Sequence, residues 1–418
     1  MKTILQSAAS VLGGEAAVRV ANYAVILFVA RAYGARTLGV YALVLSIVTV
    51  VVMFADAGLQ TAAITQLSHD TANRNQVFGS LTISKLSLLA TAALLLCLYA
   101  ALSRPGSLFV SIGMWLGLRT ILQSLSQLQM AALKSVSRAN LIGAIQSAHC
   151  VMLLCGLLLA HRFAWTLNAL LVWLVAAQFF ELLLAVTALA CTGVYPRWSR
   201  AFHFYPILKL AAPFGLAYGL ANLIIRTDTI ILAKFVSLSE LGAFSAANSL
   251  LLLVYVASWL FSSILLPGAV RIAHQGEMLR SWSNAWLRRV ALFGIPAAFF
   301  AAIIAPKLVA MLFGPAYSSG GIVASLMLLA CPFILLNSVY ATFTIATNNR
   351  VVLLSAYVAT VLATFVLDVA LGRMFGSLGI AVAIVIRETM MLFVFWLLTS
   401  GALWPAAKFE PHPFSEGN

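Results

Sequence analysis

The sequence is poor in charge, and above all in acidic residues. Of its 418 residues only 9% are charged, with 25 Lys and Arg against 11 Asp and Glu, whereas 63% are hydrophobic. A water-soluble domain needs a far more polar surface than such a composition can supply. The composition therefore predicts a protein that lies in a membrane along most of its length.

Motifs for several kinds of chemistry are missing. The chain has no GxxxxGK[ST] sequence to cradle nucleotide phosphates, which argues against ATP hydrolysis. Its 5 cysteines show no CxxC spacing and no neighbouring histidines, and its 6 histidines are expected mostly in loops. We expect reduced, packed cysteines, no metal site and no cofactor. The net charge of +14 comes without a soluble basic face, so nucleic acid is not an expected partner.

Long apolar runs follow one another, separated by short polar breaks. A membrane-spanning helix needs about 20 mostly apolar residues, and we find twelve such runs. The expected spans are residues 9–31, 37–64, 77–102, 107–131, 139–161, 165–191, 206–235, 240–267, 286–312, 320–346, 351–372 and 376–400. Little sequence remains for a water-soluble domain, and residues 404–418, which contain three prolines, are expected to be a disordered cytoplasmic tail.

The distribution of basic residues predicts the orientation. Lys and Arg resist translocation and gather in cytoplasmic loops. With the N-terminus inside, most basic loop residues, including Arg138, Arg197 and Arg280, are cytoplasmic, and fewer, including Arg162 and Lys307, lie outside. We therefore expect both termini in the cytoplasm and attribute most of the positive charge to topology and to contact with anionic membrane lipids.

Two stretches match at a constant offset of about 203 residues. FVARAYGARTLGVYAL occupies residues 28–43, and LAKFVSLSELGAFSAA occupies residues 232–247. Each contains the end of a span, a basic residue, a short break and LG-x-aromatic at the start of the next span. Because six spans separate the copies, both enter the membrane in the same direction, which predicts parallel repeats of six helices. The expected halves are residues 1–195 and 196–403.

The two repeated hairpins, with DAGLQTAA after the first and RTDTIILAKF leading into the second, resemble those of polysaccharide flippases of the multidrug/oligosaccharidyl-lipid/polysaccharide exporter superfamily. The resemblance implies an all-α protein with two six-helix lobes arranged as a V and a cavity lined by the first, second, seventh and eighth spans. It also implies that oligosaccharide repeat units linked to undecaprenyl diphosphate cross the cytoplasmic membrane for surface polysaccharide synthesis. A polysaccharide polymerase and a chain-length co-polymerase are the protein partners to expect.

Ionisable residues within spans are costly, so each one needs a partner or a wet cavity. In the first span, Glu15, Arg19 and Asn22 share one helical face, and Glu15 can pair with Arg19 along the helix. That pair is either structural or part of a substrate site.

The seventh span carries a stripe of small and polar residues. Its members Gly215, Gly219, Asn222, Arg226 and Thr229 repeat at helical spacing and suit a cavity wall or a close helix contact. Asp228 lies about 200° around the helix from Arg226, so it faces elsewhere. If the resemblance holds, Arg19 and Arg226, with Asn22 and Asn222, contact the substrate, because guanidinium groups bind phosphate bidentately.

The remaining buried charges have structural or coupling interpretations. Asp56, Asp228 and Glu15 are candidates for ion coupling or for a charge network. Arg119 and Glu181 are expected to pair within the first lobe, and Lys85 is expected to extend towards the cytoplasmic surface. We expect a second network of Asp368, Arg387 and Glu388 in the second lobe.

Three other functions stay open. A drug or cation antiporter of the same superfamily would have a cavity dominated by carboxylates and aromatic rings. A membrane-embedded glycan polymerase or ligase would carry a long outer loop, and none is long enough here. A scaffold subunit would pack its polar stripes without a cavity. A non-enzymatic flippase fits the sequence best.

Overall fold

The computed structural model describes residues 2–56, 58–69, 73–103, 106–197, 204–347 and 349–400, which are helical almost throughout. The chain divides into two compact units, unit 1 at Met1–Ser245 and unit 2 at Ala246–Asn418. The expected tail at 404–418 lies outside the described residues, and the expected division after residue 195 stays a prediction. No strand occurs in the parts of the chain just given.

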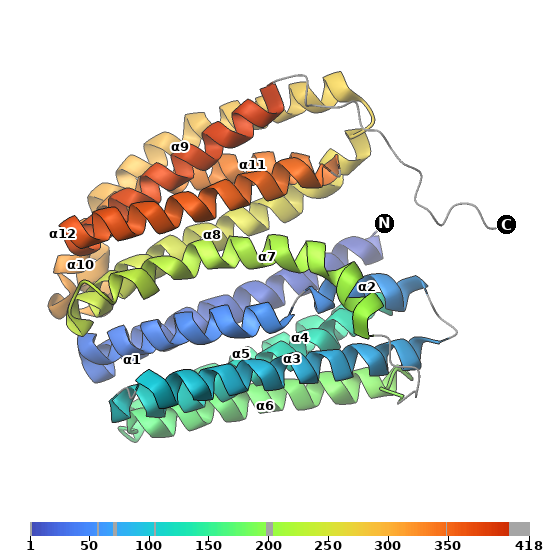
Figure 1. Cartoon of the computed structure of the whole chain (residues 1–418), viewed down its shortest axis with the longest axis horizontal. Coiled ribbons are helices and arrows are strands. Elements are labelled where there is room, and N and C mark those ends of the chain that lie inside the picture. Colours follow the sequence, from blue (N-terminus) through green and yellow to red (C-terminus); the bar gives the residue numbers. More distant parts are fainter. Residues whose placement is uncertain are drawn as a thin grey trace. The chain divides into compact units, whose positions relative to one another are not determined.

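Unit 1 is built from seven helices and the first turns of an eighth, which run side by side in Figure 1. Their bounds are α1 Lys2–Asp56, α2 Leu59–His69, α3 Arg74–Ser103, α4 Ser107–Ser135, α5 Ala139–Arg162, α6 Leu167–Cys191, α7 Phe204–Leu232 and α8 Leu238–Ile272. The helix α1 packs against α3, α4, α5 and α7, and α4 also packs against α6. A core cluster centred on Leu59, Phe78 and Leu128 joins α2, α3 and α4.

Unit 2 contains the rest of α8 and the remaining helices of the chain. These are α9 Gly276–Phe313, the short 3-10 helix η1 Pro315–Tyr317, α10 Ser319–Leu328, α11 Cys331–Ala346 and α12 Arg350–Ser400. Both α10 and α11 pack against α9 and α12. Two small clusters form the core, one around Leu279 and Phe343 and the other around Ala356 and Phe395.

The expected number of membrane crossings agrees with the helix lengths. Within the described ranges, nine helical segments are long and apolar enough to cross a membrane. Two of them, with 56 and 49 residues, are each about twice as long as one crossing requires. Each contains a glycine kink, Gly34 with φ 83° or Gly376 with φ 58°. Counting these two twice and adding α7 gives the twelve predicted crossings.

Three helical regions differ in detail from the predicted spans. The second span breaks after Asp56, where Gly58 has a φ of 78°, and continues as α2. The tenth span divides into α10 and α11, with a proline in the first turn of α11. The helix α9 begins at Gly276 rather than at 286, because Leu279 and Trp282 already pack on unit 2, with Trp282 5.4 Å from Phe343 between ring centroids.

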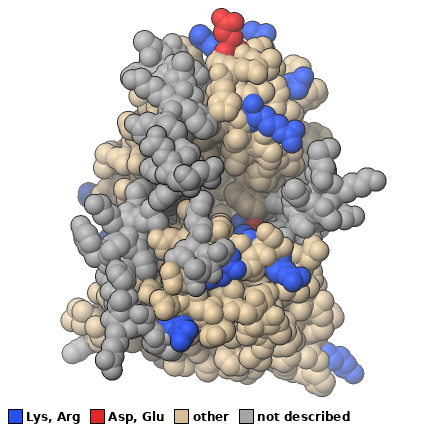
Figure 2. Space-filling view, turned by 90° about the vertical axis from the view of Figure 1, so that its right-hand side faces the viewer, with Lys and Arg blue, Asp and Glu red and all other residues tan. Residues whose placement is uncertain are grey.

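The surface has the apolar character of a membrane protein. Many large hydrophobic side chains are exposed, among them Leu102 at 75%, Phe293 at 71% and Ile303 at 75%. In Figure 2 most of the described surface belongs to uncharged residues, and Lys and Arg occupy isolated positions. Exposed apolar area on this scale would make a water-soluble protein aggregate, so lipid must cover it.

The internal repeat has a structural counterpart in unit 1. Gly39 at the start of the second crossing packs against the backbone of Leu238, and Gly242 packs against the backbone of Ala35. The 203-residue offset relates Gly39 to Gly242 and Ala35 to Leu238, so the two contacts are equivalent by the repeat. The flanking repeat partners Leu38 and Leu241 are both fully buried. The two hairpins therefore meet through a pseudo-symmetric contact in which neither glycine has room for a side chain.

Candidate functional site

The polar stripe on α1 combines an exposed cation with half-buried neighbours. Arg19 is exposed, whereas Glu15 and Asn22 are half-buried. The Glu15 carboxylate pairs with Lys134 of α4 at 3.5 Å. The expected pairing of Glu15 with Arg19 is therefore wrong, because a basic side chain on the neighbouring helix α4 takes the carboxylate. Arg19 lies on the exposed side of the stripe.

Asn22 connects α1 to a buried network. Its Nδ2 donates to the Val18 carbonyl at 2.9 Å, and its Oδ1 accepts a hydrogen bond from Arg119 of α4. Both polar atoms are thus engaged within the protein. A direct contact of Asn22 with substrate stays a prediction, and the structure adds an interhelical role for this side chain.

The expected ion pair between Arg119 and Glu181 is wrong. Glu181 Oε2 accepts a hydrogen bond from Gln178 Nε2 at 2.6 Å and lies 3.2 Å from Nδ1 of His149. The sequence interpretation gave no role to His149, although it lies in the predicted span 139–161. This residue lies within α5 and is 1% exposed. Its position in an apolar run, with a Gln and a Glu three residues apart on the next helix, was the available signal.

The polar stripe of α7 alternates between buried and half-buried positions. Gly219 and Thr229 are buried, whereas Asn222 and Arg226 are half-buried. A side chain at Gly219 would be in ordinary contact with Met53 of α1, so this part of the stripe forms a helix contact. Asp228 is only 1% exposed. That Arg226 and Asp228 face different surroundings stays a prediction, as do their roles towards substrate or ions.

Lys85 of α3 forms a buried ion pair with Asp56, the last residue of α1. Lys85 is 0% exposed and Asp56 is 6% exposed, so the expectation that Lys85 extends to the surface is wrong. The pair lies at the break of the second crossing, where a helix C-terminus also favours a cation. One turn further, Gln60 of α2 donates to Gln127 of α4 at 2.8 Å. The broken crossing is thus tied to two neighbouring helices through polar groups.

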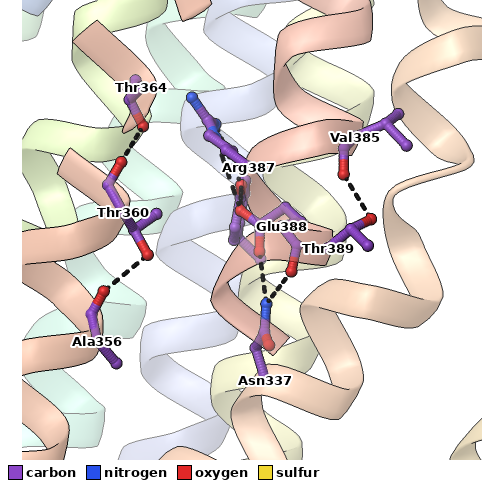
Figure 3. A network of polar contacts seen from close by, with 9 residues as sticks. Asn337, Ala356, Thr360, Thr364, Val385, Arg387, Glu388 and Thr389 are labelled. Carbon is purple, nitrogen blue, oxygen red and sulfur yellow. Dashed lines mark hydrogen bonds and ion pairs between the residues drawn. The ribbon is translucent and has the colours of Figure 1, made fainter. Parts of the chain in front are cut away.

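Unit 2 contains part of the second predicted network, in which Arg387 and Glu388 of α12 lie beside Asn337 of α11 (Figure 3). Glu388 of α12 accepts hydrogen bonds from Tyr255 of α8 at 2.7 Å and from Asn337 Nδ2 of α11 at 2.9 Å. Arg387 Nε lies 3.8 Å from the Glu388 carboxylate. The predicted association of Arg387 with Glu388 is confirmed, whereas Tyr255 and Asn337 were not expected. Asp368 is fully buried, and its place in this network stays a prediction.

A metal centre has no support in the part of the chain that the structure describes. Over those ranges no three His, Cys, Asp or Glu side chains come close enough together to hold a metal ion. The five cysteines are free thiols.

A family profile for polysaccharide biosynthesis proteins matches residues 28–320, about 70% of the chain. The chain belongs to this family. The matched region begins at the first repeated hairpin and ends at the start of α10, so it contains both copies of the repeat and also Arg119, His149 and Glu181.

This member of the polysaccharide biosynthesis family shares its fold with solved transporters. It is similar to the lipid II flippase MurJ in an inward closed conformation, with a TM-score of 0.76, 13% identity, and coverage of 93% of this chain and 87% of that chain. It is also similar to an inward-facing multidrug resistance MATE transporter of the MOP superfamily, with a TM-score of 0.71 and 15% identity. That match covers 92% of this chain and 94% of that chain. A third similar structure is a MOP superfamily transporter from Pyrococcus furiosus, with a TM-score of 0.66 and 15% identity. The match covers 96% of this chain and 95% of that chain.

Comparison with curated proteins finds no match. The apolar helices and the shared fold together establish a multi-pass membrane protein. At these identities the solved structures establish the fold alone.

Proposed function

We propose that this protein is a flippase that moves undecaprenyl-diphosphate-linked oligosaccharide repeat units across the cytoplasmic membrane. The observation that carries the proposal is its membership of a polysaccharide biosynthesis family together with an exporter fold. A polytopic protein with almost no extramembrane domain contributes to such a pathway most directly by moving a lipid-linked intermediate between leaflets.

The substrate headgroup combines a diphosphate with a polar glycan, and the polar faces of α1 and α7 suit it. Arg19 is exposed and Arg226 is half-buried, so neither residue is sealed off within the protein. Charge-assisted hydrogen bonds to phosphate are worth about 1.5–3 kcal/mol each, and more where water is scarce. The two arginines are proposed to hold the diphosphate, while Asn222 contacts the glycan and the polyprenyl chain stays in lipid.

Transport is proposed to follow alternating access by two six-helix lobes, residues 1–195 and 196–403, with both termini in the cytoplasm. No bond of the substrate is made or broken, so the protein acts as a carrier rather than an enzyme. A polysaccharide polymerase and a chain-length co-polymerase would use the product on the outer face. Surface polysaccharide of the O-antigen, capsule or exopolysaccharide type would be the end product.

Deletion of the gene tests the proposal. We expect loss of surface polysaccharide and accumulation of a lipid-linked oligosaccharide, which chemical analysis of the lipid fraction would identify. A deletion strain with unchanged lipid-linked intermediates would refute the flippase role. Accumulation of lipid II would instead show that the oligosaccharide is the wrong substrate.

Substitution of the two arginines tests the site. Arg19→Ala with Arg226→Ala should abolish export while the amount of protein in the membrane stays the same. Arg373→Ala is the matched control, because it removes another exposed guanidinium, on α12 in unit 2. Full export by the double variant would exclude the proposed role of the arginines.

A drug or cation antiporter is the second candidate, and the fold shared with MATE transporters favours it. A cation carrier needs accessible carboxylates, however. Of the three carboxylates of unit 1 that were predicted to couple ions, Asp56 and Asp228 are buried, and the half-buried Glu15 pairs with Lys134. Unchanged surface polysaccharide in the deletion strain, together with increased drug susceptibility, would support this alternative.

A further inference from the structure

Four helices of unit 1 meet at a buried polar network that the proposed function has not used. It contains Asn22 of α1, Arg119 of α4, His149 of α5 and Glu181 of α6, with Gln178 beside Glu181. Arg119, His149 and Glu181 are 7%, 1% and 7% exposed. Ionisable groups at this depth of a membrane protein are expensive and usually functional.

The contacts of His149 define its tautomer. Its Nδ1 lies 3.1 Å from the Ala177 carbonyl oxygen and 3.2 Å from Glu181 Oε2. A carbonyl oxygen can only accept a hydrogen bond, so Nδ1 carries the proton. His149 is therefore a donor to Glu181 in its neutral form and needs no positive charge to make this contact.

Two donors converge on one oxygen of Glu181. Both His149 Nδ1 and Gln178 Nε2 face Oε2, while Gln178 also lies 3.4 Å from the hydroxyl of Ser126. Oε1 is then the carboxyl oxygen on which a proton can reside. No cationic side chain lies within ion-pair distance of this carboxyl group in the described part of the chain, and the neutral acid avoids the cost of a buried charge.

Arg119 supplies the positive charge of the network without touching the carboxylate. Its Nη2 donates to Asn22 Oδ1, and its Nε is buried without a hydrogen-bond partner among the described residues. Arg119 nevertheless acts electrostatically on both His149 and Glu181. Among the described residues, α1 contributes Asn22 to the network, and the Cys150 thiol, next to His149 in the chain, donates to the Ala17 carbonyl at 3.6 Å.

We propose that Glu181, held by His149, is the binding site for a proton that drives transport, and that Arg119 links its occupancy to α1. With the proton on Oε1, Glu181 is neutral and Arg119 stays with Asn22, as in this structure. When the proton leaves to water, Glu181 becomes an anion and draws Arg119 away from Asn22. The network then changes from a net charge of +1 to zero, and no other bond changes.

This inference rests on the proposed function, since it names the ion that powers the flippase. Asn22 shares its face of α1 with Glu15 and Arg19, so release of Asn22 would free the same stripe that is proposed to hold the substrate phosphate. Proton release and substrate release would thus be linked through one helix.

Infrared difference spectroscopy of the purified full-length protein in lipid nanodiscs, between low and high pH, tests the inference directly. We expect a carboxylic acid band that is lost as the pH rises, is absent from Glu181→Gln, and persists to higher pH in Arg119→Gln. In Asn22→Ala, Arg119 is free to approach Glu181, so the band should be lost at lower pH. Glu277→Gln, which changes an exposed carboxylate on α9, is the matched control and should leave the band unchanged.

The same variants separate this inference from the proposed function. Glu181→Gln should fold but fail to export polysaccharide. If it exports normally while the deletion strain does not, the proton site is wrong and the flippase stands. If the band behaves as expected but deletion leaves lipid-linked intermediates unchanged, the flippase proposal is wrong. Should Glu181→Gln misfold, His149→Asn and Asn22→Ala carry the test, and a band that neither one shifts overturns the inference.

Discussion

Replacement of Gly39 by Ala should destabilise the contact between the two repeated hairpins. A Cβ at this position would lie 3.0 Å from the carbonyl carbon of Leu238 and closer still to its oxygen. At Gly242 it would lie 2.7 Å from the carbonyl carbon of Ala35, again with the oxygen closer. A backbone carbonyl cannot rotate away as a side chain can, so the helices must separate. Overpacking of this kind costs about 1–3 kcal/mol.

The assay is thermal or denaturant unfolding of the purified protein in detergent, followed by circular dichroism. Gly117→Ala in α4 is the control, because nothing lies within 4 Å of a Cβ at that position. Ala is the better helix former by up to about 1 kcal/mol, so the control should be neutral or slightly stabilised. A loss of 1–2 kcal/mol in Gly39→Ala would lower its folded-to-unfolded ratio by about 5- to 30-fold.

The pseudo-symmetry of the contact makes the prediction sharper. Gly242→Ala should cost about as much as Gly39→Ala, since each glycine meets the equivalent carbonyl of the other repeat. The double variant should cost less than the sum, because helices already separated by one methyl group accommodate the second more easily. Strict additivity, or single variants as stable as Gly117→Ala, would refute the reasoning.

Three further substitutions test other contacts by the same unfolding assay. Lys85→Ala leaves Asp56 buried without its partner and should lower the free energy of unfolding by about 3–5 kcal/mol. Lys85→Met combined with Asp56→Leu should recover most of this loss. If the double variant shows no recovery, the buried pair is not the cause of the loss. Glu388→Ala removes the shared acceptor of the unit 2 network and should also cost about 3–5 kcal/mol. Gly156→Ala would place a Cβ 2.9 Å from Cε2 of Trp173, whose indole is fixed by a hydrogen bond of 2.9 Å to a backbone carbonyl, and we expect about 1–3 kcal/mol of destabilisation. A fully stable variant at either of these last two positions would contradict the corresponding contact.

Much of the fold follows from local sequence properties. Apolar runs of membrane-spanning length predict helices because lipid offers backbone groups no other hydrogen-bond partners. The crossings and the repeated hairpins were therefore predictable from residues close together in the chain. Breaks inside an apolar run were harder to predict. Gly58, for example, interrupts the helix between α1 and α2, although the sequence stays apolar on both sides of it.

Partners of buried charges were the weakest part of the sequence interpretation. Lys85 was expected to extend to the surface, and ion pairs were expected between Arg119 and Glu181 and between Glu15 and Arg19. All three expectations were wrong. Spacing along one helix shows only which residues share a face. It does not show which side chain of a neighbouring helix reaches that face.

The sequence by itself determined that this chain crosses a membrane many times, that its two halves are related, and that a few charges had to be accommodated out of water. Its composition, the period of its apolar runs and its repeat are properties of residues near one another, or of one constant offset. Only the tertiary structure decided that Asp56 pairs with Lys85, that Asn22 holds Arg119, and that His149 joins Glu181. These contacts depend on the rotation and the depth of each helix against its neighbours, which the packing of many side chains fixes together.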